Sequence, residues 1–202
     1  MKIDHAKFFN GYRSAYGRLS QSTVNGLEQL GQHMESDPAL TDLRWAAYML
    51  ATVKHECGNE WHPITERGAK SYFNKYEPGT PIGRRLGNTQ PGDGWRYRGR
   101  GYVQITGRRN YELLTKELGL GPDEDLIQDP DQALRPMIAY RIMSLGMRKG
   151  LFTGKKLTDY IDGQKCDYRS ARRIINGLDK ADLIKGYAVK LEEILRAAIV
   201  EE

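Results

Sequence analysis

The sequence of 202 residues has little cysteine and no long apolar run. Its two cysteines, Cys57 and Cys166, are too few for a disulfide framework, and neither lies in a CxxC motif or a His/Cys cluster. The longest uninterrupted apolar run, Trp45 to Ala51, is seven residues, whereas a membrane-spanning helix needs about 20. We therefore expect packed or inert thiols, no membrane insertion, no metal site and no cofactor.

Signals for export and for modular organisation are also missing. The N-terminal stretch has neither the apolar core nor the small-residue cleavage site of a signal peptide. No internal repeat, low-complexity segment or Pro/Ser-rich linker separates a catalytic module from a targeting module. We expect a single domain over residues 1–202, with a helical N-terminal part over residues 1–40, that stays in the cytoplasm unless something releases it.

Positive charge is in excess and is concentrated in one stretch. Lysine and arginine number 31 against 26 acidic residues, a net charge of +5. This indicates an anionic partner, either nucleic acid, an anionic lipid surface or an acidic cell-wall polymer, although a solvated surface would have the same composition. The crowded arginines are Arg84, Arg85, Arg96, Arg98, Arg100, Arg108 and Arg109.

Helical patterns dominate both ends of the chain. Val24, Leu27, Leu30 and Met34 recur at spacings of three and four, as on the buried face of an amphipathic helix. The run that follows Asp42 is apolar almost all round, which is typical of a helix that crosses a core. We expect helices over residues 20–35, 42–57, 110–118, 130–147 with a kink at Pro136, 168–175 and 180–199.

The middle of the chain is rich in glycine and proline, which favours loops and short strands between Gly79 and Gly107. The alternation in YRGRGYVQIT predicts a strand over residues 97–106, with Tyr102 and Gln104 on its polar face. Helices around a small irregular sheet make an α+β, mainly helical fold, in which the active site lies in the cleft that the sheet lines.

Glu56 is a candidate general acid. It is expected in the last turn of the apolar helix, which closes near Gly58. Both the negative end of the helix dipole and the apolar surroundings disfavour an ionised carboxyl group there. A carboxyl group that stays protonated near neutrality can donate a proton in catalysis.

Glu66 is a candidate general base. It follows Pro63 in a broken, polar segment beside Arg67, where we expect it to be solvated and ionised. Two glutamates ten residues apart are also common as surface charge or helix caps, and Glu60 is a rival for either role.

Other motifs are incomplete. The zinc motif H-E-x-x-H that begins at His55 has Asn59 at its second histidine position, and G-x-G-x-x-G has Gln104 at its last glycine. Trp95, Tyr97 and Tyr102 alternate with arginines, and such rings stack on bases or sugars when they are not part of the core.

The segments ATVKHECG, ITERG, GDGWRYRGRGYVQITGRRNY and RRIINGL, in this order, resemble the family 19 glycoside hydrolases. This group contains chitinases and phage endolysins and has a lysozyme-like fold. The matching motifs run from about residue 45 to residue 178. The resemblance implies that Glu56 is the general acid and Glu66 the general base.

The resemblance also assigns substrate-binding residues. It implies that Thr106 holds the attacking water, and that Gln104, Asn110 and Asn176 contact the substrate. With these we group Tyr97 and Tyr102 as candidate sugar-binding residues.

The expected function is that of an endolysin-type peptidoglycan hydrolase that cleaves β-1,4 glycosidic bonds between amino sugars by an inverting mechanism. The alternatives are a chitinase that acts on N-acetylglucosamine polymers and a basic module that binds cell wall or nucleic acid without catalysis. For the hydrolase we expect a peptidoglycan or chitin-like partner, no nucleic acid, no separate cell-wall-binding module and a monomeric state. It would wait in the host cytoplasm and reach the cell wall after holin-type release.

Overall fold

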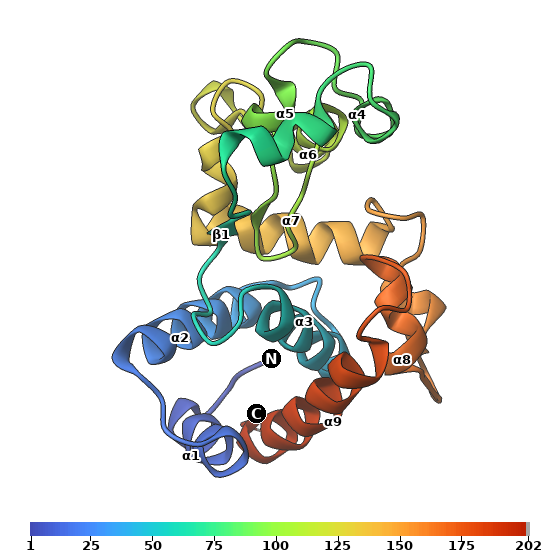
Figure 1. The fold of residues 1–202 in the computed structure, drawn as a ribbon. Coiled ribbons are helices and arrows are strands. Elements are labelled where there is room, and N and C mark those ends of the chain that lie inside the picture. Colours follow the sequence, from blue (N-terminus) through green and yellow to red (C-terminus); the bar gives the residue numbers. More distant parts are fainter. Residues whose placement is uncertain (201–202) are drawn as a thin grey trace. The chain divides into compact units, whose positions relative to one another are not determined.

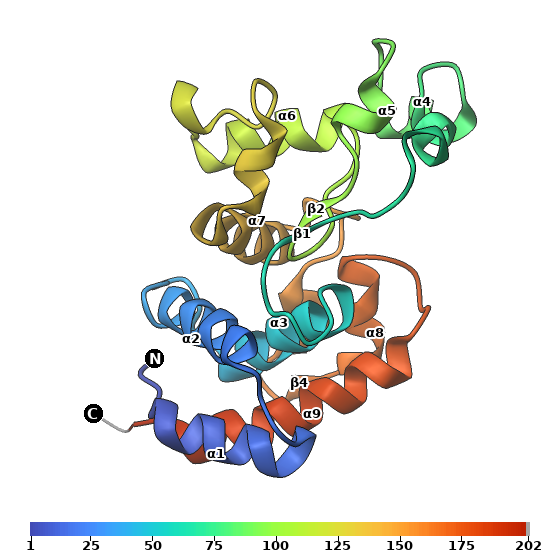
Figure 2. The same cartoon turned by 60° about the vertical axis from the view of Figure 1, so that its left-hand side comes forward.

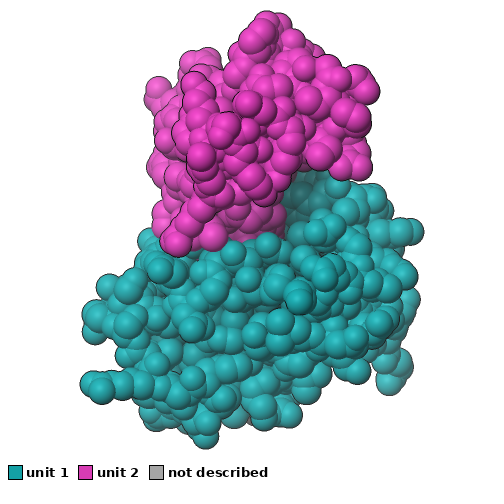
Figure 3. Space-filling model, in the orientation of Figure 1, with its two compact units in different colours: residues 1–62, 143–202 teal, residues 63–142 magenta. Residues whose placement is uncertain are grey.

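The computed structural model describes residues 1–200, which form two compact units. Unit 1 combines residues 1–62 with the chain from Met143 onward, and unit 2 comprises residues 63–142. The two units are coloured separately in Figure 3. Helix α7, Pro136–Lys149, contributes residues to both units. No helix within residues 1–200 is long and apolar enough to cross a membrane.

Unit 1 is built from helices around α9, Ala181–Ala198, which packs along α3, Leu43–Glu56, and α1, His5–Tyr16 (Figures 1 and 2). The ends of the described chain meet there, because Ile3 and Ile199 form an antiparallel bridge. The remaining elements are α2 (Gln21–Glu35), η4 (Leu157–Asp159), β3 (Ile161–Asp162), β4 (Lys165–Cys166), α8 (Tyr168–Ala171) and η5 (Arg172–Ile174).

Side-chain caps set the starts of the long helices in unit 1. The Ser20 hydroxyl accepts a hydrogen bond from the Thr23 N–H and begins α2, and Asp42 accepts one from the Arg44 N–H and begins α3. Residues Ala46 to Lys54 of α3 are all buried, as the apolar run predicts. The helices expected over residues 20–35, 42–57 and 180–199 are therefore confirmed, as are helices within the first 40 residues.

A buried lysine on α3 joins three helices and a loop of unit 1. The Lys54 ammonium donates hydrogen bonds to the Tyr12 hydroxyl at 3.0 Å and to Asn59 Oδ1 at 3.2 Å. It also lies between 4.2 and 5.9 Å from the ring centroids of Tyr12, Tyr16, Trp61 and Tyr187. Cation–π contacts and two acceptors compensate part of the cost of burying this charge.

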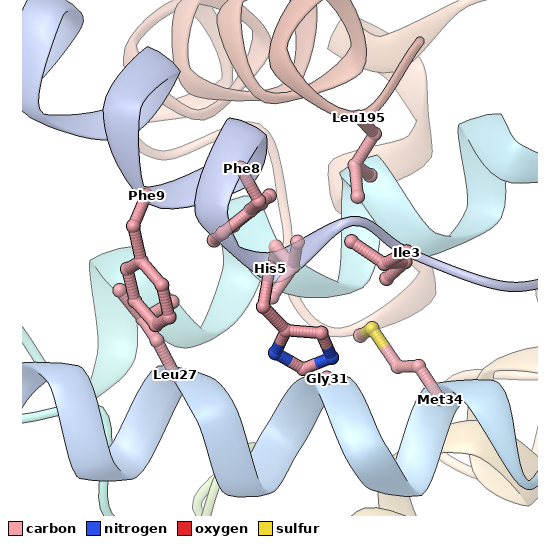
Figure 4. A pocket seen from close by; sticks show the side chains of 9 residues that line it. Ile3, His5, Phe8, Phe9, Leu27, Gly31, Met34 and Leu195 are labelled. Carbon is pink, nitrogen blue, oxygen red and sulfur yellow. The ribbon is translucent and has the colours of Figure 1, made fainter. Parts of the chain in front are cut away.

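A small cavity remains between α1, α2 and the core of unit 1 (Figure 4). Its volume is about 10 Å³, enough for one water, and its lining is apolar apart from His5. The His5 ring lies 3.2 Å from the Glu35 carboxylate. We interpret the cavity as a packing defect because a substrate would not fit.

Unit 2 contains short elements that surround one two-stranded sheet. Strand β1, Ile64–Thr65, pairs antiparallel with β2, Arg100–Gly101, so that Ile64 is opposite Gly101. The other elements are η1 (Lys70–Tyr76), α4 (Pro81–Leu86), α5 (Asp93–Arg96), α6 (Arg108–Leu118), η2 (Pro122–Glu124), η3 (Pro130–Leu134) and the first half of α7. The α+β, mainly helical class is confirmed.

The strand predicted over residues 97–106 is wrong in extent. Only Arg100 and Gly101 pair with β1, and the chain then turns back so that Arg100 and Ile105 exchange backbone hydrogen bonds. Gly101 and Gln104 both have positive φ, +87° and +54°, which an extended strand does not allow. The apparent alternation therefore belongs to a tight hairpin.

Two predicted helices also differ from the structure. Pro136 does not kink a continuous helix, because the chain forms the separate turn η3 and then starts α7 at Pro136. Proline is well suited to the first turn of a helix, where its missing N–H has no partner to lose. The helix expected over residues 168–175 is divided into α8 and η5, and the one expected at Asn110 begins at Arg108.

Candidate active site

Glu56 lies at the C-terminal end of α3, in unit 1, and contacts a buried arginine. Arg172, at the start of η5, donates a hydrogen bond from Nη1 to Glu56 Oε1 at 2.9 Å. The side chain of Arg172 is 4% exposed and that of Glu56 is 19% exposed. Arg172 is also held by the Asp179 carbonyl through Nε, so its guanidinium has a defined position.

The Arg172 contact corrects the expected surroundings of Glu56. The sequence predicted only an apolar helix and the negative end of a helix dipole, which disfavour charge, but a guanidinium favours the carboxylate. Arg172 was missed although it lies in the quoted RRIINGL motif. The sequence alone does not distinguish Arg172 from its neighbour Arg173. In the structure Arg172 is buried with Ala171 and Ile174, whereas Arg173 is exposed.

Glu66 lies directly after β1, in unit 2, and is held by two neutral donors. The Tyr76 hydroxyl donates to Oε1 at 3.0 Å, and the Gly99 N–H donates to Oε2 at 3.1 Å. Both donors favour the ionised carboxylate. Burial and the nearby Glu66 charge raise the pKa of Tyr76, so its hydroxyl keeps its proton. The expectation of solvation beside Arg67 missed both donors.

A side chain at Gly99 would crowd the side chains of Gln104 and Glu66. A Cβ atom at Gly99 would lie 2.9 Å from Gln104 Oε1 and 3.1 Å from Glu66 Oε2. The three residues therefore form one compact group, in which the backbone of Gly99 separates an amide oxygen from a carboxylate.

Gln104, Thr106 and Asn110 form a connected series in the same unit. Gln104 Nε2 donates to the carbonyls of Ile64 and Gly101, at 2.9 and 3.0 Å, and thus ties the hairpin to β1. The Thr106 hydroxyl donates to the Gln104 carbonyl at 3.0 Å, and Asn110 Nδ2 donates to the Thr106 carbonyl at 2.7 Å. Thr106 Oγ1 is left with lone pairs that can accept a hydrogen bond from water.

Tyr97 and Tyr102 do not offer exposed rings in this structure. Tyr97 is 1% exposed and lies against Tyr111 and Arg108, with ring centroids 5.2 Å apart in the tyrosine pair. Tyr102 is fully buried. Both rings therefore belong to the core of the protein. The expectation that they stack on sugar is replaced by core packing.

Asn176 and Glu60 are exposed residues of unit 1. The Asn176 N–H donates to the Arg172 carbonyl at 2.9 Å, which places Asn176 one turn beyond the arginine that holds Glu56. Its side-chain oxygen accepts the Gly177 N–H at 2.8 Å and its amide NH₂ remains a donor. Glu60 lies in the loop between Gly58 and Trp61.

The described residues contain no group of three or more His, Cys, Asp or Glu side chains that could hold a metal ion. Asn59, at the position of the missing zinc ligand, binds Lys54 instead. Cys57 is buried and Cys166 is exposed, and neither forms a disulfide.

The arginine-rich stretch contains three kinds of residue, which are ion-paired, partly buried or exposed. Arg100 pairs with Asp131 at 2.7 Å and Arg108 pairs with Asp93 at 2.6 Å, so these two stabilise unit 2. Burial lowers the pKa of Arg98, which stacks on Trp95 at 3.9 Å. Arg84, Arg85, Arg96 and Arg109 are exposed and supply positive surface charge.

No family model matches the sequence. A glycosyl hydrolase family 19 domain-containing protein from Haemophilus influenzae is 40% identical over 83 residues, which cover 39% of this chain and 40% of the relative. The match thus spans about two fifths of the length of that relative.

Solved structures extend the likeness to nearly the whole fold. Chitinase C from Streptomyces griseus has a TM-score of 0.60 at 18% identity, covering 99% of this chain and 79% of that one. A mutant chitinase C has a TM-score of 0.60 at 17% identity, over 99% and 95% of the two chains. A bacterial family 19 chitinase has a TM-score of 0.56 at 18% identity, over 98% and 96%. The resemblance to family 19 and the lysozyme-like helical fold are confirmed.

Proposed function

We propose that this chain is a glycoside hydrolase that cleaves β-1,4 bonds between the amino sugars of peptidoglycan by acid–base catalysis. The observation that carries the proposal is the carboxylate of Glu66, which the Tyr76 hydroxyl and the Gly99 N–H hold in one position as hydrogen-bond donors, so that it is placed to accept a proton from water. The family 19 motifs and the fold of the chitinases support it.

Glu56 is the general acid in this proposal. Arg172 binds Oε1, which leaves Oε2 to carry the proton. When that proton passes to the glycosidic oxygen, the bond from this oxygen to the sugar C1 breaks and Glu56 becomes a carboxylate. The guanidinium of Arg172 stabilises this new negative charge and thereby favours the transfer.

Glu66 is the general base. It accepts one proton from a water molecule whose oxygen forms the new bond to C1, and Thr106 Oγ1 accepts the second hydrogen of that water in a hydrogen bond. Gln104, Asn110 and Asn176 supply amide groups to the substrate. Water attacks from the face opposite the leaving group, so the product has the inverted anomeric configuration.

The exposed arginines of unit 2 favour peptidoglycan over chitin, because peptidoglycan carries carboxylates and chitin is neutral. A peptidoglycan hydrolase of this kind would act as a phage endolysin that reaches the cell wall after a holin opens the membrane. We propose that it acts as a monomer without a metal or cofactor.

One experiment tests the reaction and its stereochemistry. Purified peptidoglycan and chitin oligomers are incubated with the protein, the fragments are identified by mass spectrometry, and the new reducing end is followed by NMR before mutarotation. We expect peptidoglycan fragments whose first anomer is inverted. Retention of configuration, or a glycosyl group trapped on Glu66, would contradict the role of Glu66 as a base.

A chitinase is the second candidate, because the structural neighbours are named as chitinases. Faster cleavage of chitin oligomers than of peptidoglycan strands in the same experiment would favour it. Tight binding to the cell wall without any fragment would instead indicate the binding module.

A further inference from the structure

The segment that follows Glu66 has an unusual charge distribution. From Arg67 to Tyr76 it contains three cations, Arg67, Lys70 and Lys75, and no acidic residue. Arg67 and Lys70 are exposed, and within residues 1–200 no ion pair joins any of the three cations to a carboxylate. The proposed base is therefore followed in the chain by positive charge that no carboxylate of the described residues neutralises.

Lys75 is placed by two tyrosines of η1. Its ammonium lies 3.5 Å from the ring centroid of Tyr72 and 4.8 Å from that of Tyr76. The Tyr76 hydroxyl donates in turn to Glu66. A short series of contacts thus links the ammonium of Lys75 to the carboxylate of the proposed base.

Tyr72 has the exposed aromatic ring that was expected at Tyr97 and Tyr102. It is 48% exposed, while its inner edge packs on Phe73 with ring centroids 5.1 Å apart. A Cβ atom at Gly68 would lie 3.0 Å from Tyr72 Cδ1, so the ring contacts the backbone two residues beyond Glu66. An apolar surface and a cation therefore occur together beside the proposed base.

We propose that Tyr72 and Lys75 form a subsite for an amino sugar that carries a carboxylate, as an N-acetylmuramyl residue with its peptide does. The inference rests on the proposed function and specifies its substrate class. The tyrosine ring offers apolar surface to the C–H face of a sugar, and the ammonium pairs with the carboxylate. A neutral N-acetylglucosamine unit would use only the ring.

The ammonium of Lys75 lies on the Tyr72 ring in the free protein. Lysine has a flexible four-carbon stem, and an exposed cation–π contact is weak. A bound carboxylate therefore draws the ammonium away from the ring and frees the ring face for the sugar. Discrimination between charged and neutral sugars then depends on Lys75, whereas binding of either sugar depends on Tyr72.

The test compares two forms of one substrate, soluble glycan strands with their peptides and the same strands with their carboxylates amidated. The measured quantity is the ratio of kcat/KM for the charged over the amidated strands. For Lys75→Gln we expect this ratio to fall about two- to fivefold, the range of an exposed charge pair. Lys116→Gln, which removes an exposed lysine of α6, should keep the ratio of the wild type.

Tyr72 is tested with two variants. Tyr72→Ala should raise KM for both the charged and the amidated strands, whereas Tyr72→Phe should leave KM for both strands unchanged.

An equal loss of kcat/KM on both strands for Lys75→Gln would overturn the subsite, because Lys75 would then only support Tyr76 and Glu66.

If the wild type cleaves neither strand, the proposed function fails, and NMR titration with muramyl dipeptide tests the subsite alone. Shifts in the Tyr72 signals that weaken in Lys75→Gln and persist in Lys116→Gln would support the subsite, and shifts that are equal in both variants, or absent, would overturn it.

Discussion

Glu56 and Glu66 differ in the charge of the groups that they contact. Glu56 meets the guanidinium of Arg172, whereas Glu66 meets a hydroxyl and a backbone N–H. In the proposed mechanism, the cation beside Glu56 stabilises the carboxylate that remains after proton donation. The two proposed roles therefore belong to residues whose contacts differ in charge.

Replacing Glu56 by glutamine should abolish hydrolysis without unfolding the protein. The amide is nearly isosteric and its oxygen still accepts from Arg172, but it cannot supply a proton, so kcat should fall about 100-fold or more. The rate on peptidoglycan and Tm are measured together. Glu60→Gln, on the adjacent loop, serves as the matched control and should retain activity. A folded Glu56→Gln variant with substantial activity would remove Glu56 from the acid role.

At the scale of elements, the contact between β1 and the hairpin that follows β2 positions the proposed base. Gly99→Ala would push a methyl group between Gln104 and Glu66, within 2.9 and 3.1 Å of their oxygens. We expect at least a tenfold loss of kcat, because displacing a catalytic group by about 1 Å can cost up to 100-fold. Gly121→Ala is the control, since a Cβ atom there would meet nothing within 4 Å and its φ is −75°. Equal activity of the two variants would contradict the role of this contact.

The packing of α1, α3 and α9 around Lys54 predicts a dependence of stability on pH. Burial lowers the pKa of Lys54 below its ordinary value of 10.5. Between the lowered value and 10.5 the unfolded chain binds more protons than the folded one, so the free energy of unfolding should rise with pH. Burial raises the pKa of Tyr16 to about 12, and the pKa of Tyr12 is raised as well, so these tyrosines lower stability only above pH 10.

The measurement is Tm from pH 8 to pH 10 for the wild type, Lys54→Met and Lys185→Met, the last of which changes an exposed lysine of α9. The difference in Tm between Lys185→Met and Lys54→Met should grow with pH. A difference that stays constant would show that the amine of Lys54 does not titrate in this range.

At the scale of the whole molecule, exposed cations should control binding to anionic cell wall. Because Arg100 and Arg108 are paired internally, the surface charge comes from residues such as Arg84 and Arg85. Binding to purified peptidoglycan should weaken as ionic strength passes the physiological value, where the screening length is about 8 Å. Pull-down across a salt series measures it.

The double variant of Arg84→Gln and Arg85→Gln should bind more weakly at low salt. Arg18→Gln combined with Lys185→Gln removes the same charge from exposed positions of unit 1 and is the control. Binding that does not change with salt would assign these arginines to a solvated face without a partner.

The sequence by itself determined the long helices and which two glutamates, Glu56 and Glu66, are the catalytic candidates. Helix periodicity and caps act between residues a few positions apart, so α2, α3 and α9 could be predicted nearly to the residue. The hairpin at Gly101 was missed because the positive φ values at Gly101 and Gln104 override the pattern of alternating side chains. The turn before Pro136 was missed as well. Local spacing alone cannot distinguish a strand from a hairpin of the same residues.

Only the tertiary structure decided what surrounds each carboxylate. Arg172 reaches Glu56 across 116 positions of sequence, and Gly99 reaches Glu66 across 33. Tyr97 and Tyr102 are buried while Tyr72 is exposed, although all three rings occur among cations in the sequence. The physical reason is that burial and ion pairing depend on which distant segments pack together, and hydrophobic periodicity records only which face of a segment is turned inward.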